Sequence, residues 1–223
     1  MIERDRLVPR QKNVSYLALV RHGQTTYNLQ GLWTGWIDAQ LTEHGVAEAR
    51  NAAQNLTDIE FDRAFSSSLS RAKDTLLVIQ QDTQHEGIPT HHAEALRERN
   101  YGIYGGKNKW EIKKLVGDEA FQEMRRGWDT EIPEGETSRD VHERVSDHFD
   151  QEMLPRLING ENLLVVAHGN SIRVLEKKLE HLSVEDFMKL EIGTGEVHVY
   201  FFDKKTGQAL VKLVRAEKTD KDF

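Results

Sequence analysis

Two short apolar segments, each followed by a histidine and a glycine, constrain the fold of this chain more than any other feature. Ser15–Val20 (SYLALV) precedes RHG at 21–23, and Leu163–Ala167 (LLVVA) precedes HG at 168–169. Apolar runs of this length are typical of central strands in a parallel sheet whose two faces are covered by helices. The carboxyl ends of parallel strands meet at one edge of the sheet, where open α/β sheets bind ligands. We therefore expect both histidines to contribute to one site.

The pattern between and after these strands predicts an α/β fold with a mostly parallel sheet, because strands alternate with segments of helical periodicity. Thr42 and Ser183 are expected to cap helices, and a long helix is expected to start near Thr137. Pro155 is expected to end or kink this long helix near Leu154. The expected helices span about 42–56, 68–80, 110–115, 119–126, 137–154 and 171–182, with a short one after 183, and further strands are expected at 61–66, 90–96, 197–202 and 210–214.

The chain is long enough to bury a substantial core without covalent staples. We expect a flexible N-terminal extension at 1–13, a single catalytic α/β domain at 14–215 and a charged C-terminal tail at 216–223. Cysteine is absent, which excludes disulfides, thiolate nucleophiles and cysteine-ligated metals and fits a reducing compartment. The sequence has neither an apolar run long enough to span a membrane nor the pattern of a secretory signal. We therefore expect a cytoplasmic protein.

The charge balance limits the possible partners. The formal net charge is −7, from 30 basic and 37 acidic residues. Nucleic acids and anionic membranes need a basic face, so neither is an expected partner. An anionic substrate would have to be held by a local basic cluster.

The histidines at the two strand ends favour phosphoryl transfer through an imidazole. A neutral imidazole can attack phosphorus and hold the group as a phosphohistidine, provided that an acceptor such as a backbone carbonyl holds its other nitrogen. The transferring group carries negative charge and needs a cationic cradle. Arg21 adjoins His22, and Arg71 lies near the start of a helix, where backbone N–H groups also bind anions. Gly23 and Gly169 would let the backbone approach the phosphate.

Two other interpretations remain open from the residues alone. A single buried histidine is more often a satisfied core residue than a catalyst, although a pair at two strand ends beside glycines fits that interpretation poorly. Metal binding is disfavoured, because His91 and His92 would point to opposite faces of a strand and the chain lacks an HExxH motif. Proton transfer needs a carboxylate near the cradle, and Glu98 is a candidate because it lies just after an expected strand.

A series of segments around and between the histidines carries a family resemblance. LVRHGQTTYN at 19–28 is followed in order by GLWTGWIDAQLTEHG, SSSLSRAKDT, LRERNYG, RRGWD and AHGNSIRVLEKKLEHLSVEDF. This series resembles the histidine phosphatase superfamily and, within it, the cofactor-dependent phosphoglycerate mutases, over about residues 17–203. The resemblance implies the fold of that family, a three-layer α/β/α arrangement around a mostly parallel central sheet.

The resemblance also implies a role for each matching residue. His22 is the nucleophile that becomes phosphorylated, and Glu98 is the general acid and base. The groups that hold the transferring phosphoryl group are Arg21, Arg71 and His168, with Asn28 and the backbone of Gly169 beside them. The implied substrate contacts are Thr34 and Gly35, and the implied ligands of the carboxylate or second phosphate are Tyr101, Lys109, Arg125, Arg126 and Asn170.

The activity implied by the resemblance is the interconversion of 3-phosphoglycerate and 2-phosphoglycerate, an isomerase step of glycolysis and gluconeogenesis. The enzyme would be primed by 2,3-bisphosphoglycerate, would need no metal, and would bind small phosphorylated three-carbon acids; the resemblance also allows a homodimer. One alternative is a phosphatase of small phosphorylated metabolites on the same fold, for which phosphate release would exceed isomerisation. A second is an inactive phospholigand-binding protein, which ligands would stabilise without turnover.

Overall fold

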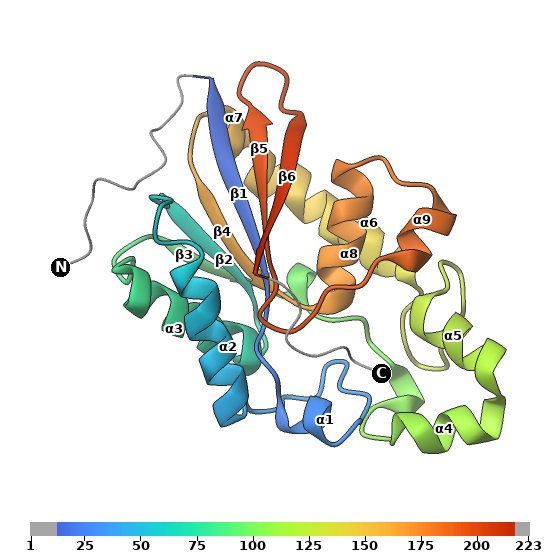
Figure 1. Cartoon of the computed structure of the whole chain (residues 1–223). Coiled ribbons are helices and arrows are strands. Elements are labelled where there is room, and N and C mark those ends of the chain that lie inside the picture. The colour runs from blue at the N-terminus through green and yellow to red at the C-terminus, as the bar shows by residue number, and fades with distance from the viewer. Residues whose placement is uncertain (1–12, 217–223) are drawn as a thin grey trace.

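The computed structural model describes residues 13–216 and contains a six-stranded sheet between two layers of helices (Figure 1). The strand order is β3-β2-β4-β1-β5-β6. The pairs β2–β3, β2–β4 and β1–β4 are parallel, and β1–β5 and β5–β6 are antiparallel. The predicted three-layer fold with a mostly parallel sheet is therefore confirmed. The strands are β1 (Val14–Arg21), β2 (Arg63–Ser67), β3 (Thr90–Ala93), β4 (Leu163–Ala167), β5 (Val197–Asp203) and β6 (Ala209–Ala216).

Helices α2 and α3 cover one face of the sheet and α6 to α9 the other, while α4 and α5 stand apart from both layers (Figure 1). None of the helices among residues 13–216 is long and apolar enough to cross a membrane. The helices are α1 (Thr26–Leu29), α2 (Glu43–Gln54), α3 (Ser70–Thr83), α4 (Lys109–Val116), α5 (Asp118–Arg126), α6 (Ser138–His148), α7 (Leu154–Ile158), α8 (Gly169–Leu179) and α9 (Val184–Lys189).

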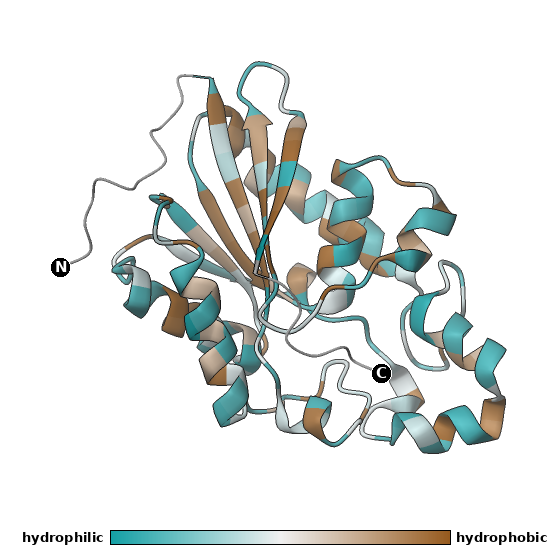
Figure 2. Cartoon of the chain, in the orientation of Figure 1, coloured by the Kyte–Doolittle hydropathy of each residue, from teal (hydrophilic) through white to brown (hydrophobic). Residues whose placement is uncertain are grey.

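Alternation along the central strands divides the core between the two faces of the sheet. On β1, Leu17 and Leu19 pack towards α6 and α8, whereas Ala18 and Val20 pack towards α2 and α3. All residues of β4 are buried. Figure 2 accordingly shows hydrophobic colour concentrated on the central strands, with hydrophilic residues on the outer surfaces of the helices. A third apolar cluster, away from the sheet, consists of Trp33, Tyr101, Ile112, Phe121, Met124 and Ile132.

Most helix starts lie where the sequence predicts them. Thr42, Thr137 and Ser183 are the N-caps of α2, α6 and α9, and each side chain accepts a hydrogen bond from the backbone N–H three residues on. Pro155 is expected to end or kink the long helix near Leu154. The helix departs from α geometry in the π-helical segment Phe149–Met153, directly before Leu154, and then continues as α7 with Pro155 in its first turn.

Other element boundaries differ from those expected. The strand predicted at 90–96 ends at Ala93 and continues as a 3₁₀ turn over Glu94–Leu96. Helix α8 begins at Gly169, two residues earlier than predicted, so its N-terminus follows β4 almost directly. Helix α1 was not predicted. The expected extension and tail lie outside the described residues, except for Asn13 and Ala216, so the proposed division of the chain stays a prediction.

Gly23 is required by packing against helix α2. A Cβ built on Gly23 would lie 2.1 Å from the carbonyl oxygen of Gly45, and one on Gly45 would lie 2.1 Å from the carbonyl oxygen of Gln24. The loop after β1 therefore touches the first turn of α2 backbone to backbone. The expectation that Gly23 lets the backbone approach a phosphate stays a prediction. A Cβ on Gly169, by contrast, would lie 3.7–3.8 Å from the Arg21 and Glu98 side chains, as expected for a glycine at a site.

His198 on β5 is a buried histidine that connects the sheet to the loop before this strand. Its ring nitrogens bond to the carboxylates of Glu176 and Glu196. The other carboxylate oxygen of Glu196 accepts from the Gly193 backbone, and its carbonyl accepts from the backbone N–H of Arg21. Burial alone would lower the pKa of His198, but the two carboxylates outweigh burial and raise the pKa to about 9. His198 therefore carries charge in the interior as a structural residue.

We predict that Gly23→Ala destabilises the protein by about 1–3 kcal/mol, because the added methyl group overlaps the Gly45 backbone and the two segments must move apart. The matched control is Gly87→Ala, since a Cβ at Gly87 would contact nothing within 4 Å. Urea unfolding of the three proteins measures the difference. Equal stabilities of the two variants would contradict this account of the loop.

The raised pKa of His198 predicts a specific dependence of stability on pH. A group whose pKa is raised on folding stabilises fully below its unfolded value, near 6.5, and the stabilisation is lost as the pH rises through about 9. The destabilisation by His198→Gln should therefore be greatest below pH 6.5 and shrink by about 3 kcal/mol or less by pH 10. Urea unfolding of both proteins across this range provides the measurement. A difference that stays constant with pH would mean that His198 is not charged in the fold.

Candidate active site

The candidate site lies at the carboxyl ends of β1 and β4. Arg21 pairs with Ala167 in the parallel register, so the residues that follow these two positions are neighbours. The rings of His22 and His168 meet edge to face, with centroids 4.9 Å apart. Both histidines therefore lie at one edge of the sheet, as the two strand motifs predict.

A pocket opens above these histidines, and it gathers nearly all the residues singled out from the sequence. Six cationic side chains and two carboxylates line it, although the whole chain carries a net charge of −7. His168 does not line the pocket, because it lies fully buried beneath it. The predicted residues in the lining are Arg21, His22, Asn28, Thr34, Gly35, Arg71, Glu98, Tyr101, Lys109, Arg125, Arg126, Gly169 and Asn170. Their placement does not test their roles, which stay predictions.

The hydrogen bonds of His22 determine its tautomer. Its Nδ1 lies 2.7 Å from the carbonyl oxygen of Gly23, which can only accept, so Nδ1 carries the proton. Nε2 lies 3.3 Å from Nε of Arg71, which can only donate. The imidazole of His22 is therefore neutral and presents a lone pair at Nε2, the form that attacks phosphorus.

Arg71 is held rigidly beside this lone pair. It lies in the first turn of α3, is 1% exposed, and donates to the carbonyl oxygens of Ile37 at 3.0 Å and Gly35 at 2.8 Å. Burial lowers the pKa of Arg71 to about 10, so the group stays cationic at neutral pH. Arg21 enters from the end of β1 and is anchored by a 2.6 Å hydrogen bond to the carbonyl oxygen of Ile192. The two guanidinium groups thus present positive charge at the site.

His168 is neutral and fully buried. Burial and the nearby Arg71 cation, followed by His22 and Arg21, lower its pKa well below 6.5. Neither ring nitrogen has a hydrogen-bond partner among residues 13–216. A neutral imidazole keeps one N–H donor, and an unsatisfied buried donor is costly. His168 at the N-terminus of α8 is therefore suited to donate to an anion bound between the histidines.

Glu98 lies across the site from the cradle and is 9% exposed. Its Oε1 accepts from the backbone N–H groups of Arg99 at 2.8 Å and Asn170 at 3.2 Å. Its Oε2 lies on the side of Gly169, 3.8 Å from where a Cβ of that glycine would be. One oxygen thus fixes the carboxylate, and the other remains to exchange a proton with a ligand in the pocket.

A buried chain of polar groups continues from Glu98 along one wall of the pocket. The side-chain amide of Asn170 donates to the Tyr101 hydroxyl at 2.9 Å and accepts from Arg173 at 2.9 Å. Arg173 is 6% exposed, and its Nε has no partner among the described residues. Burial lowers the pKa of Arg173 to about 10, so it too remains cationic. Arg173 was not among the site residues predicted from the sequence. Its spacing of three residues from Asn170 could have indicated it, because the two residues then share one face of α8.

The far wall of the pocket is a second group of cations. Lys109 begins α4, and Arg125 and Arg126 end α5. Arg126 forms an ion pair with Glu191 and also donates to the carbonyl oxygen of Met188. Glu191 was not predicted, because it follows α9 far along the chain, and only the fold brings this loop to the pocket.

Three smaller residues complete the rim. The amide oxygen of Asn28 accepts from the backbone and hydroxyl of Thr25, so the amide nitrogen is the end of this side chain that can donate to a ligand. Gly35 has a φ of +52°, and its carbonyl oxygen accepts a hydrogen bond from Arg71. Thr34, the residue before it, also lines the pocket. The whole arrangement offers a nucleophilic nitrogen, a cationic cradle, a carboxylate for proton transfer and a second, more distant cationic region.

Comparisons with known proteins agree with this geometry. A family model of the histidine phosphatase superfamily (branch 1) matches residues 17–214. The 2,3-bisphosphoglycerate-dependent phosphoglycerate mutase of Xanthobacter autotrophicus is 45% identical over 186 residues, which cover 82% of this chain and 90% of that protein. Among solved structures, the phosphoglycerate mutase from Bacillus anthracis has a TM-score of 0.72 at 25% identity, over 91% of this chain and 93% of that one.

A phosphatase shares the same fold. The α-ribazole phosphatase from Shigella flexneri has a TM-score of 0.76 at 24% identity, over 90% of this chain and 96% of that one. This likeness concerns the fold alone. The family model covers most of the chain, and the paired histidines, the cationic cradle and the carboxylate lie together in one pocket. The protein therefore belongs to the histidine phosphatase superfamily (branch 1), in which it is a relative of the 2,3-bisphosphoglycerate-dependent phosphoglycerate mutases.

Proposed function

We propose that this protein is a phosphoglycerate mutase that interconverts 3-phosphoglycerate and 2-phosphoglycerate and is primed by 2,3-bisphosphoglycerate. The observation that carries the proposal is the presence of two cationic regions in one pocket: Arg21 and Arg71 beside the His22 nitrogen, and Lys109, Arg125 and Arg126 on the far wall. A three-carbon acid with two anionic groups suits both regions at once. The names of relatives at 42–45% identity support the same assignment.

In the first step, Nε2 of His22 attacks the phosphorus of the primer, and a P–N bond forms as the P–O bond to the carbon skeleton breaks. Arg21, Arg71 and the His168 N–H bind the oxygens of the transferring group. Gly23 keeps its hydrogen bond to Nδ1–H and so stabilises the positive charge that the ring gains. Glu98 gives its proton to the leaving oxygen, which becomes the free hydroxyl of a monophosphate.

Transfer back uses the same groups in reverse. Glu98 takes the proton of a substrate hydroxyl as that oxygen attacks the phosphohistidine, and the electrons of the P–N bond return to Nε2. The bisphosphate then turns in the pocket, so that its other phosphoryl group faces His22. A second attack leaves the isomerised product and regenerates the phosphoenzyme. Water must be kept from the phosphohistidine, because hydrolysis would make the protein a phosphatase.

The proposal includes three expectations that stay predictions: no metal, a cytoplasmic location and a homodimer as one allowed assembly. The cationic side chains and His168 supply the charge stabilisation that Mg²⁺ gives in kinases. We therefore expect full activity in the presence of a chelator.

The proposed function is tested by incubating the protein with EDTA and 3-phosphoglycerate, with and without a trace of 2,3-bisphosphoglycerate, and following phosphorus NMR. We expect a 2-phosphoglycerate signal whose rate of appearance depends on the bisphosphate. Inorganic phosphate without isomerisation would identify a phosphatase instead. Binding without any reaction would identify a phospholigand-binding protein.

The Arg126–Glu191 ion pair predicts opposite effects of two substitutions on substrate binding. Glu191 competes with a bound anion for Arg126, so Glu191→Gln should lower KM for 3-phosphoglycerate. Arg126→Gln should raise KM by about 10–100-fold, because a hydrogen bond between charged groups contributes about 1.5–3 kcal/mol. Glu185→Gln, at an exposed position of α9, is the matched control. If both pocket variants raised KM, the ion pair would only hold the loop in place.

A further inference from the structure

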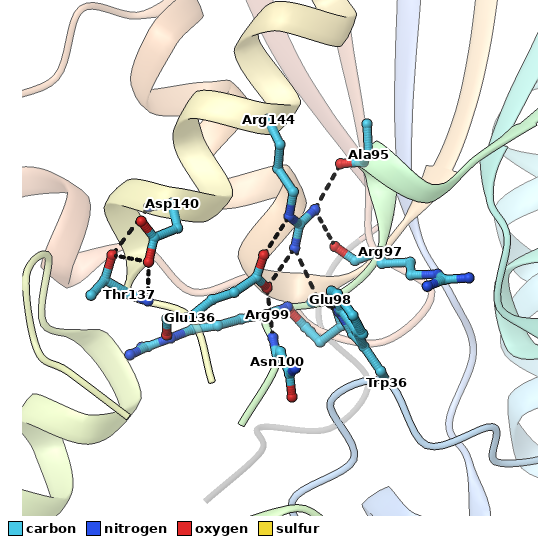
Figure 3. A network of polar contacts seen from close by, with 10 residues as sticks. All are labelled: Trp36, Ala95, Arg97, Glu98, Arg99, Asn100, Glu136, Thr137, Asp140 and Arg144. Atoms are coloured by element: carbon cyan, nitrogen blue, oxygen red, sulfur yellow. Dashed lines mark hydrogen bonds and ion pairs between the residues drawn. The ribbon is translucent and has the colours of Figure 1, made fainter. Parts of the chain in front are cut away.

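The segment that carries Glu98 is held from behind by one arginine of α6. Arg144 donates to the carbonyl oxygens of Ala95 at 2.7 Å, Arg97 at 2.9 Å and Glu98 at 3.1 Å. Its two remaining N–H groups bind both carboxylate oxygens of Glu136, at 2.7 and 2.9 Å. All five guanidinium donors are therefore used. Figure 3 shows Arg144 between this strip of backbone and Glu136.

Glu136 holds the other end of the same segment. Its Oε2 accepts from the backbone N–H of Asn100 at 2.8 Å, and its own N–H donates to the Asn100 carbonyl at 2.9 Å. Its carbonyl oxygen accepts from Nε of Arg99 at 2.6 Å. Residues 95–100 are thus fixed on both sides of Glu98 by Arg144 and Glu136, which we call the Arg144–Glu136 clamp. Both side chains are only 16–21% exposed, and neither lines the pocket.

The position of this backbone decides where the Glu98 carboxylate lies. Oε1 of Glu98 accepts from the N–H of Arg99, inside the clamped segment, and from the N–H of Asn170 on α8. A shift of residues 95–100 would move the carboxylate away from Asn170 and from the pocket. A misplacement of about 1 Å can lower the rate of a proton-transfer step about a hundredfold.

We propose that the Arg144–Glu136 clamp is a positioning device for proton transfer by Glu98. The inference rests on the proposed function, because that function assigns the acid and base role to Glu98. A clamp that only stabilised the fold would affect every reaction of the site equally. A positioning clamp affects only steps in which a proton must move, and the leaving group of the substrate separates the two cases.

Two phosphoryl donors whose leaving groups differ in their need for a proton distinguish a positioning clamp from a purely structural one. When 2,3-bisphosphoglycerate phosphorylates His22, the P–O bond breaks and the leaving alkoxide needs the proton of Glu98. When 2,4-dinitrophenyl phosphate does so, the same P–N bond forms, but the phenolate departs as an anion and takes no proton. Single-turnover rates are measured by quenching the phosphoenzyme in alkaline denaturant, in which the P–N bond of phosphohistidine survives, for the first donor, and by the burst of dinitrophenolate for the second.

We expect Arg144→Lys and Glu136→Gln to slow phosphorylation by 2,3-bisphosphoglycerate about 10–100-fold and to change the dinitrophenyl phosphate burst less than about threefold. Lysine keeps the charge but lacks the planar fork of five donors, and Gln keeps the shape of Glu136 without its charge. The matched control is Arg139→Lys, on the same helix, because Arg139 and its partner Asp129 are both exposed and neither lines the pocket. This variant should change neither rate.

Glu98→Gln is the reference for a selective loss of proton transfer. If Glu98→Gln shows the selective loss but both clamp variants do not, the positioning role is wrong and the proposed function stands. If both rates fall together in both clamp variants, the clamp only supports the fold, and the proposal is likewise wrong. If Glu98→Gln shows no selective loss, the assignment of the acid fails, and the clamp has no acid to position.

Discussion

The parallel pairing of β1 with β4 is the constraint on which the rest of the structure depends. This pairing places His22 and His168 at the same edge of the sheet. The segment that follows each histidine packs against the sheet or its helices. The loop after His22 touches the first turn of α2, and α8 begins directly after His168. A slip of one residue in the register would turn the apolar side chains of β1 to the wrong faces. The hydrophobic core therefore fixes the distance between the two imidazoles of the candidate site.

The site gathers cations in the interior, and each is held by an acceptor of the protein itself. Removing a guanidinium group from water is costly unless its donors are satisfied. Arg71 donates to two carbonyl oxygens and to His22, and Arg173 to the carbonyl of Phe187 and to Asn170. Burial lowers the pKa of both groups to about 10 but leaves them charged. These two guanidinium groups are therefore preorganised, because acceptors of the protein hold them in place before any anion binds.

The sequence alone predicts the parts of the structure that depend on local patterns. The two apolar strands, the histidines at their ends and the N-caps Thr42 and Ser183 follow from residue type and spacing. The packing of Gly23 against Gly45 could not be predicted, because this contact joins segments that are distant in the sequence. The irregularity expected near Pro155 takes the form of a π-helical segment at Phe149–Met153, which residue type alone does not predict. Glu191 pairs with Arg126, and Arg144 binds backbone carbonyl oxygens of residues 95–98. Only the folded chain brings these partners together, so the sequence does not predict them.

The central claim is that the phosphoryl group passes through Nε2 of His22. The most direct test is to trap the phosphoenzyme formed from 2,3-bisphosphoglycerate, locate the modified residue by peptide mass spectrometry and assign the nitrogen by phosphorus NMR. The tautomer held by Gly23 predicts a single phosphohistidine, at Nε2 of His22, and none in His22→Ala. Phosphate on Nδ1 of His22 or on His168, or a mutase that turns over without any phosphohistidine, would contradict the account.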